Sequence, residues 1–267
     1  MIRLAVAGAA GRMGKTILGL AFKDKNIQVT GALEQAGSPD VGLDAGILAG
    51  AGESGIAITD RAETALKKAD VLIDFTHFSA TPRHLETAVK FKTGYVVGTT
   101  ALPAETLAKL RAASKKIPVV QSPNMSIGVN LLLKLAEIAA KALDESYDME
   151  IMEIHHRHKK DSPSGTAMKL LEVVAAARKR NLSRDVVYGR EGDIGARPHG
   201  QIGTLALRGG DVVGDHTLYF LGDGERIELT HKASSREAFA KGAITAAKFI
   251  AKRKNGLYDM AQVLGIS

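Results

Sequence analysis

The chain has 267 residues, of which 45% are hydrophobic and 24% charged, a composition typical of a folded globular protein. It contains no cysteine, which excludes disulfide bonds, a thiol nucleophile and a thiolate zinc site. No stretch reaches the roughly 18 consecutive apolar residues that a membrane span needs. The first residues begin a strand pattern in place of a signal peptide. We therefore expect a cytoplasmic protein with no membrane partner.

The formal net charge of +7 is spread along the chain. Residues 1–126 carry 15 Lys and Arg against 11 Asp and Glu, and residues 127–267 carry 21 against 18. Aromatic residues make up only 4% and Trp is absent, so a stacking platform for single-stranded nucleic acid is poorly supplied. A non-enzymatic dinucleotide sensor that binds DNA is an alternative, but no helix-turn-helix is recognisable. We expect a small anion as partner and no nucleic acid.

In the first half of the chain, short runs rich in Val and Ile alternate with helical patterns. This alternation is typical of a parallel sheet with helices on both faces. Strands are predicted at residues 2–7, 29–33, 71–75, 95–97 and 118–121, and helices at 13–22, 80–91 and 103–113.

The pattern changes after residue 124. Helices are predicted at residues 127–143, 166–180 and 238–252, and strands at 149–155, 202–208, 212–221 and 226–232. The last three strands are expected to form an antiparallel sheet, with a tight turn at residues 222–225. The final helix is expected to pack on the first domain. The predicted fold is α/β, with a Rossmann-type dinucleotide-binding domain (residues 1–126 and 236–267) and an inserted α+β domain (residues 127–235).

A glycine-rich turn, in LAVAGAAGRMGKTI, follows the first strand and opens the first helix. Gly8, Gly11 and Gly14 stand at three-residue spacing. Glycines let the backbone approach a pyrophosphate, which the N–H groups of the helix N-terminus then bind. Glu34 ends the second strand, where an acid binds the adenosine ribose of a dinucleotide. A tight turn without a ligand is the alternative.

Glu34 also bears on which dinucleotide binds. Its carboxylate favours the ribose hydroxyls of NAD and would repel a 2′-phosphate, whereas Arg12 and Lys15 tolerate one. We expect NADH as the preferred cofactor, with NADPH as the alternative.

Two further loops follow predicted strands, GTTALP from Gly98 and SPNMS from Ser122. Ligands of open α/β sheets bind outside the carboxyl ends of the strands, so these loops are placed to touch the nicotinamide half of the cofactor. Ordinary strand-to-helix turns, with Thr and Ser as helix caps, explain the two loops equally well.

The stretch EIHHRHKKDSPSGTA, residues 153–167, places three His and three permanent cations within residues 155–160. Several cations can bind a substrate with more than one carboxylate, and His transfers protons near neutral pH. Ser164 is placed to cap the next helix, whose N–H groups near Gly165 and Thr166 can hold a carboxylate. In an extended strand His155 and Lys159 would lie about 13 Å apart, so the chain must turn after His155 for both to reach one ligand.

Two other interpretations of this basic loop exist. His156, His158 and Asp161 suggest a zinc site, but neighbouring cations oppose a divalent metal, so we expect no metal. A solvated run of charges without function is the other.

With these motifs the sequence resembles the dihydrodipicolinate reductase family of bacterial lysine biosynthesis, also named for its 4-hydroxy-tetrahydrodipicolinate substrate. Residues 153–167 resemble its long signature, and the similarity spans the chain. The other matching segments are VAGAAGRMG at the start, DFT at 74–76, VGTT at 97–100, SPNMSIGVN at 122–130, VVGDHTLYF at 212–220, ELTHKASSR at 228–236 and the ITAAKF that follows it.

The resemblance implies a tetrameric NAD(P)H-dependent reductase that converts 4-hydroxy-tetrahydrodipicolinate, a cyclic dicarboxylate, to tetrahydrodipicolinate in the diaminopimelate route to lysine. The inserted domain would bind the substrate and build the subunit interfaces. Another NAD-linked reductase, acting on a different dicarboxylate, is the alternative.

The resemblance also implies roles for individual residues. His155 would be the acid/base residue with Lys159 as a proton donor beside it, which leaves open which of the two delivers the proton. The implied substrate-binding residues are His156, Ser164, Gly165, Thr166 and Arg236. The implied cofactor-binding residues are Gly8, Ala9, Ala10, Gly11, Arg12, Met13, Glu34, Gly98, Thr99, Thr100, Ser122, Pro123, Asn124 and Met125.

Two positions depart from the pattern of some family members. Gln35 follows the ribose-binding acid where those members carry an Arg suited to a 2′-phosphate, and His77 after DFT stands at another such position. Both departures favour NADH.

Overall fold

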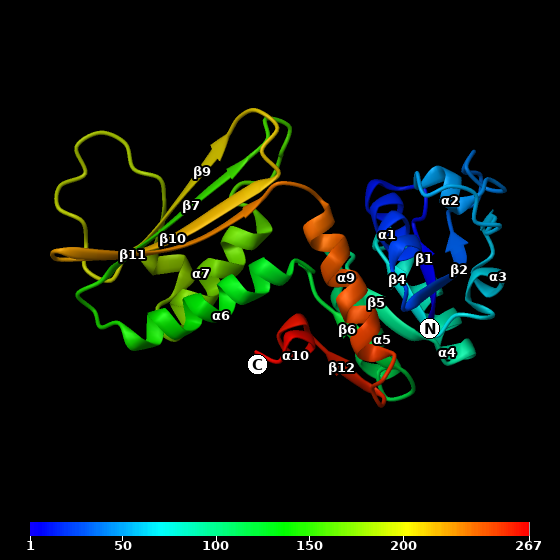
Figure 1. Ribbon diagram of the computed structural model, residues 1–267. Coiled ribbons are helices and arrows are strands. Elements are labelled where there is room, and N and C mark those ends of the chain that lie inside the picture. The colour runs from blue at the N-terminus through cyan, green and yellow to red at the C-terminus, as the bar shows by residue number, and fades with distance from the viewer. Residues whose placement is uncertain (267) are drawn as a thin grey trace. The chain divides into compact units, whose positions relative to one another are not determined.

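The computed structural model describes residues 1–266, and these form two compact units (Figure 1). Residues 1–127 and the segment from 236 onward form the first unit, and residues 128–235 form the second. The first unit is thus built from both ends of the chain, and the second is an insertion. Within residues 1–266, no helix has both the length and the hydrophobicity that crossing a membrane requires.

The first unit contains a seven-stranded parallel sheet with the order β12-β6-β5-β4-β1-β2-β3. From β1 the chain builds outward on one side through β2 and β3, and on the other through β4, β5 and β6. The switch point of the sheet therefore lies beside β1, which is where such sheets bind nucleotides. The strands are β1 (Ile2–Ala7), β2 (Ile27–Leu33), β3 (Ile58–Thr59), β4 (Val71–Asp74), β5 (Gly94–Val97), β6 (Pro118–Gln121) and β12 (Gly256–Tyr258).

Helices cover both faces of this sheet. Successive residues of a strand point to opposite faces, and in the central strands both sets are hydrophobic, so each face needs a cover. Leu4 and Val6 of β1 pack with the face that carries α1 and α9, whereas Ala5 and Ala7 pack with the face that carries α3, α4 and α5. The helices of this unit are α1 (Arg12–Lys23), α2 (Ala45–Leu48), α3 (Ala62–Leu66), α4 (Thr81–Phe91), α5 (Ala104–Ala113), α9 (Glu237–Ile250) and α10 (Met260–Leu264).

The predicted Rossmann-type parallel sheet is confirmed. In the first unit, two strands, β3 and β12, and three helices, α2, α3 and α10, are not among the predicted elements, and in the second unit β8 (Val186–Tyr188) and α8 (Leu182–Asp185) are not; none of these is longer than five residues. Elements this short carry too little hydrophobic periodicity to be recognised.

The second unit contains a five-stranded sheet with the order β11-β10-β7-β9-β8, and the prediction that its later strands are all antiparallel is wrong. Strand β9 pairs in parallel with β7 and β8, whereas β10 pairs antiparallel with β7 and, as predicted, with β11. Helix α7 lies between β7 and β9 in the chain, and a strand–helix–strand crossover produces parallel neighbours. The elements are α6 (Ile127–Ala142), β7 (Asp148–His155), α7 (Gly165–Ala177), α8 (Leu182–Asp185), β8 (Val186–Tyr188), β9 (Ile202–Arg208), β10 (Gly214–Gly222) and β11 (Glu225–Ala233).

Helices α6 and α7 cover one face of the second sheet (Figure 1). On β7, Met149 and Ile151 point into this core, and every second residue of the strand is buried. The same alternation places Glu153 and His155 on the helix-covered face at the end of the strand. The strand therefore delivers an acid and a histidine to the edge of a hydrophobic core.

Candidate functional site

The turn after β1 has the close approaches that its glycines predict. Gly8 has a φ of +74°, and a Cβ atom on Gly14 would lie 2.0 Å from the carbonyl oxygen of Gly8. Gly11 caps α1 without a side-chain hydrogen bond to the helix, which leaves that role to backbone or ligand. The residues present thus fit a dinucleotide pyrophosphate at the N-terminus of α1.

Glu34, at the end of β2, lies against this turn. Its Oε2 atom accepts the N–H of Ala10 at 3.0 Å, and its Oε1 atom accepts the N–H of Gln35 at 2.9 Å. The structure therefore brings together the glycine-rich turn and the acid predicted to bind the ribose.

The loops after β4 and β5 are held beside the same turn by a buried network around Asp74. Its Oδ1 atom accepts the N–H of Thr76 at 2.9 Å, and its Oδ2 atom lies 2.8 Å from Nδ1 of His84 and 2.5 Å from the hydroxyl of Tyr95. Burial acts to raise the pKa of Asp74, but the hydrogen bonds, led by His84, outweigh it and hold that pKa below its ordinary value. The Thr99 hydroxyl donates to the Thr76 carbonyl at 3.1 Å.

The other predicted cofactor residues differ in exposure. Gly98 and Thr99 are buried and Thr100 is exposed, at the end of β5. After β6, the Ser122 hydroxyl donates to the carbonyl of Asn124 at 2.7 Å, which shapes the loop that carries the exposed Pro123. Met125 is 1% exposed, and its side chain belongs to the core of the first unit. Of this set, Met125 is thus placed to pack the core and not to meet a ligand with its side chain.

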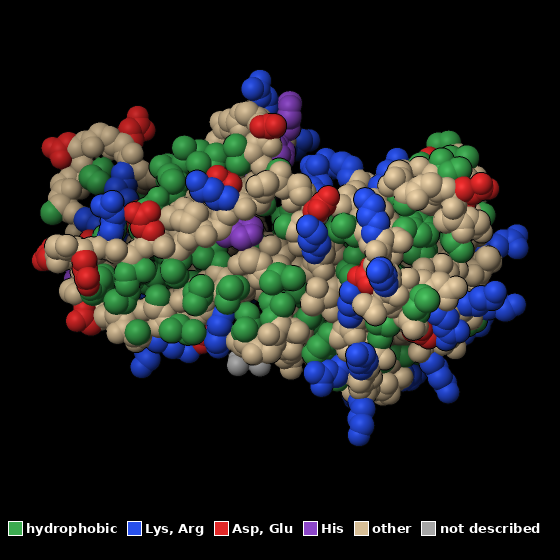
Figure 2. Space-filling model, viewed as in Figure 1, with side chains coloured by type: hydrophobic (Ala, Val, Ile, Leu, Met, Phe, Trp, Pro, Cys, Tyr) green, Lys and Arg blue, Asp and Glu red, His purple; other side chains and the backbone are tan. Residues whose placement is uncertain are grey.

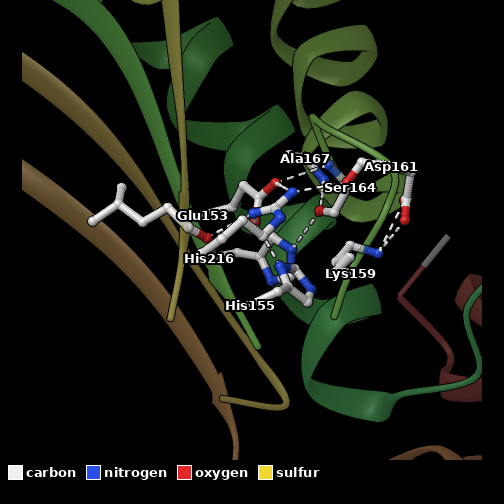
Figure 3. A network of polar contacts seen from close by, with 9 residues as sticks. Glu153, His155, Lys159, Asp161, Ser164, Ala167 and His216 are labelled. Atoms are coloured by element: carbon white, nitrogen blue, oxygen red, sulfur yellow. Dashed lines mark hydrogen bonds and ion pairs between the residues drawn. The ribbon is translucent and has the colours of Figure 1, made fainter. Parts of the chain in front are cut away.

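In the second unit, His155 is held by Glu153 from two residues earlier on β7. Nδ1 of His155 lies 2.5 Å from Oε2 of Glu153, which is fully buried (Figure 3). Arg208, the last residue of β9, donates to both carboxylate oxygens, with each N–O distance 2.8 Å. Neither Glu153 nor Arg208 is among the site residues predicted from the sequence.

The same carboxylate reaches the start of α7. The backbone N–H of Ser164 donates to Oε1 of Glu153 at 2.9 Å. The Ser164 hydroxyl accepts the N–H of Ala167 at 3.2 Å, which confirms the predicted helix cap, and lies 2.9 Å from Nε2 of His216 on β10. These contacts hold the N–H and the hydroxyl of Ser164 within the protein, and Gly165 and Thr166 follow as the first residues of α7. The contact of Ser164 with substrate stays a prediction.

The basic loop, residues 155–160, turns directly after β7. Such a turn is what His155 and Lys159 need in order to reach one ligand. The N–H of Lys159 donates to the carbonyl of His156 at 3.1 Å, and the N–H of His156 donates to Val212 at 2.8 Å. The Lys159 side chain points to Asp161, with Nζ 2.9 Å from each carboxylate oxygen (Figure 3). Arg236, the remaining predicted substrate ligand, is the N-cap of α9 in the first unit.

The buried groups of the second unit have shifted pKa values. Burial lowers the pKa of His155, and the hydrogen bond that its ring donates to Glu153 only partly offsets this. Burial also lowers the pKa of His216 to about 4, with a further contribution from the charge of His155. For Glu153, burial acts in the raising direction, but Arg208 and His155 outweigh it and lower the pKa. At neutral pH the cluster therefore contains an ionised carboxylate and two neutral imidazoles.

No group of three His, Cys, Asp or Glu side chains within residues 1–266 is arranged to hold a metal ion. The rings of His156 and His158, considered as zinc ligands from the sequence, lie 6.2 Å apart between centroids.

A dinucleotide-binding sheet, together with a unit that presents a histidine beside a cationic loop and a helix N-terminus, defines a pyridine-nucleotide-dependent oxidoreductase. Residues 2–125 match the family described as "Dihydrodipicolinate reductase, N-terminus", and residues 128–264 match "Dihydrodipicolinate reductase, C-terminus". The chain belongs to the dihydrodipicolinate reductase family, and the resemblance inferred from its motifs is confirmed.

Individual relatives agree with this assignment. The chain is 48% identical over 266 residues to the 4-hydroxy-tetrahydrodipicolinate reductase of Anaeromyxobacter dehalogenans (strain 2CP-C). The matched region covers 100% of this chain and 98% of that protein. It is 51% identical over 265 residues to the protein of the same name in Thiobacillus denitrificans, with 99% of each chain covered. The dipicolinate-bound dihydrodipicolinate reductase of Paenisporosarcina sp. TG-14 has the same fold, with a TM-score of 0.78 at 22% identity and 98% of each chain covered.

Proposed function

We propose that this chain reduces 4-hydroxy-tetrahydrodipicolinate to tetrahydrodipicolinate, with NADH as the preferred cofactor. The observation that carries the proposal is the contact of one carboxylate, that of Glu153, with both the ring of His155 and the first turn of α7. A proton-transfer group and an anion-binding helix end are thereby fixed beside each other. The dipicolinate bound by the Paenisporosarcina relative, a ring with two carboxylates, supports the substrate class.

The substrate carboxylates are assigned to two kinds of partner. One is bound by the N–H groups of Gly165 and Thr166 at the start of α7, where the helix dipole favours an anion. The other is bound by the basic loop, through His156 and the ammonium group of Lys159. The nearby Lys160 adds positive charge, so the loop and the helix end together fit a doubly negative ring.

The chemistry requires one hydride and one proton. When bound, the nicotinamide supplies the hydride to C4 of the conjugated cyclic imine that forms after loss of water from the substrate. The ring is then an enamine, and a protein group must deliver a proton to the neighbouring carbon. His155 is assigned this step. Because its pKa is lowered, the ring is neutral at neutral pH and takes up a proton from solvent before it delivers one. Lys159 of the adjacent loop stabilises the negative charge that develops.

The preference for NADH is inferred from the surroundings of Glu34. Its carboxylate lies 3.0 Å from the N–H of Ala10, so it is held at the turn where the ribose is expected. A 2′-phosphate at this place would meet a fixed negative charge.

We also propose a homotetramer built by the second unit. Hydrophobic side chains gather along the α6 side of this unit (Figure 2), where Leu131, Leu135 and Ile138 are each more than 40% exposed. On β9, Leu205 and Leu207 are exposed on the sheet face that the helices leave open. Exposed apolar surface of this kind is covered by other subunits in oligomers. Light scattering coupled to size-exclusion chromatography measures the assembly directly.

The function is tested by following NADH oxidation after the protein is mixed with the freshly made product of dihydrodipicolinate synthase. The proposal predicts oxidation that depends on both protein and product. Other cyclic and open-chain dicarboxylates, run in parallel, should give much slower rates. Faster turnover of one of these, or no oxidation by the folded protein, would contradict the assignment.

A further inference from the structure

The carboxylate of Glu153 receives hydrogen-bond donors from three segments of the second unit. Oε2 lies 2.5 Å from Nδ1 of His155 and 2.8 Å from Nη1 of Arg208. Oε1 accepts Nη2 of Arg208 at 2.8 Å and the N–H of Ser164 at 2.9 Å. The end of β7, the end of β9 and the cap of α7 therefore meet on one side chain that has no exposed surface.

A carboxylate without solvent needs strong partners to stay ionised, because burial of an unpaired charge is costly. The two-pronged contact from Arg208 supplies them. Arg208 also donates from Nη2 to the carbonyl of Asp161 at 2.8 Å, so the same guanidinium tethers the basic loop. Removal of the negative charge from Glu153 would thus also leave Arg208 without its main partner.

An ionised carboxylate can only accept hydrogen bonds. The Nδ1 atom of His155 must therefore carry the hydrogen, which leaves the lone pair of the neutral ring on Nε2. Gly214 on β10 leaves room for this end of the ring, since a Cβ atom there would lie 2.9 Å from Nε2. The ring is thus held at Nδ1, and its Nε2 end lies against a residue without a side chain.

We propose that Glu153 and Arg208 are positioning residues that fix the tautomer and orientation of His155, so that Nε2 is the atom that exchanges a proton with the substrate. The part that concerns the substrate rests on the proposed function. The tautomer itself does not, because the contacts that set it lie wholly within the second unit. A carboxylate that orients a histidine in this way is a general device for proton transfer.

The pKa of His155 depends on the charges of the groups around its ring. The groups that face His155 are Glu153 on its own strand, Arg208 on β9, His216 on β10, and Lys159 and Asp161 of the loop. Among the charged ones, Glu153 raises the pKa of His155, whereas Lys159 and Arg208 lower it. Neutralising Glu153 should therefore lower that pKa further. If protonated His155 is the acid, the limb of kcat/KM that falls with rising pH must move to lower pH.

The test is nitrogen-15 NMR of the ligand-free protein, with the ring signals of His155 assigned by their loss in His155→Gln. In the unsubstituted protein we expect hydrogen on Nδ1 and a bare Nε2 at neutral pH. In Glu153→Gln the side-chain amide can donate to Nδ1, so the ring should shift toward the Nε2–H tautomer. With substrate and NADH, kcat of this variant should fall at least about tenfold while KM changes much less.

Glu150→Gln is the matched control. Glu150 lies on the same strand and is also held by a two-pronged arginine, with Nη1 and Nη2 of Arg190 at 3.0 and 2.8 Å, but it points to the opposite face of the sheet. This variant should lose the ion pairs of Glu150 with Arg190 and Arg197 but keep both the tautomer of His155 and the pH limb. Arg208→Lys keeps a positive charge and the carboxylate, so it should retain the Nδ1–H tautomer with a smaller loss of kcat than Glu153→Gln.

An Nε2–H tautomer in the unsubstituted protein would overturn the proposal, and this measurement needs no variant of Glu153. Equal losses of kcat in Glu153→Gln and Glu150→Gln, with no movement of the pH limb, would reduce Glu153 to a structural role and also overturn it. Should Glu153→Gln fail to fold, Arg208→Lys decides, because loss of the Nδ1–H tautomer there contradicts the proposal. The expected tautomer in a protein without reductase activity would refute the proposed function alone.

Discussion

Gly214 lies against the imidazole of His155, and a Cβ atom at this position would come within 2.9 Å of Nε2 and 3.3 Å of Cδ2. The ring cannot simply turn aside, because its other nitrogen is bound to the buried Glu153. A methyl group at residue 214 must therefore displace either the ring or β10.

We predict that Gly214→Ala lowers kcat by about 10- to 100-fold, since a displacement of about 1 Å at a reacting group has an effect of this size. The matched control is Gly209→Ala, where the new Cβ atom would meet nothing within 4 Å. Steady-state kinetics of both variants check the prediction. It is wrong if the two substitutions change kcat equally.

His155→Ala is predicted to lower kcat by about 10²- to 10⁴-fold, the usual contribution of a general acid or base. KM should change far less, because the proton of His155 matters in the transition state and the carboxylates are bound by other groups. Comparable losses in kcat and in substrate affinity would instead make His155 a binding residue.

The cofactor preference is predicted from Glu34. We expect a higher kcat/KM with NADH than with NADPH, because the carboxylate would repel a 2′-phosphate. Glu34→Gln keeps an acceptor for the N–H of Ala10 but removes the charge, so the ratio should move toward NADPH while the turn stays intact. Parallel titrations measure both ratios. A tenfold preference of the unsubstituted protein for NADPH would refute this prediction.

His216 is predicted to make stability depend on pH. Burial lowers its pKa to about 4 in the folded protein. The unfolded chain takes up this proton below pH ~6.5, and the folded one does so only near pH 4. The free energy of unfolding should therefore decrease as the pH falls through this window, by about 3 kcal/mol from this group.

Urea unfolding at several pH values tests the role of His216. His216→Gln should flatten the dependence on pH, whereas His199→Gln, a change at an exposed histidine, should leave it as it is. Identical slopes for the unsubstituted protein and His216→Gln would contradict the assignment.

Most of the first unit could be predicted from the sequence. The turn at Gly8, Gly11 and Gly14 has local causes, namely a positive φ and close backbone contacts, and these select glycine directly. In the second unit, the parallel pairing of β9 with β7 was missed, although the intervening helix is a signal for it. The order of strands depends on long-range packing that periodicity alone does not encode.

The partners of His155 could be predicted only in part. The two-residue period of β7 places Glu153 on the same face as His155 and Ile151, and an acid at a core position must have a partner. That the partner is Arg208, 55 residues later, depends on the register between β7 and β9. Tertiary pairing of this kind has no local signature in the sequence.

The most direct test of the proposed function is a crystal structure of the protein with pyridine-2,6-dicarboxylate. We predict that one carboxylate lies on the N–H groups of Gly165 and Thr166, the other at His156 and Lys159, and the ring next to Nε2 of His155. A ring bound elsewhere, with the start of α7 and the basic loop left empty, would contradict it.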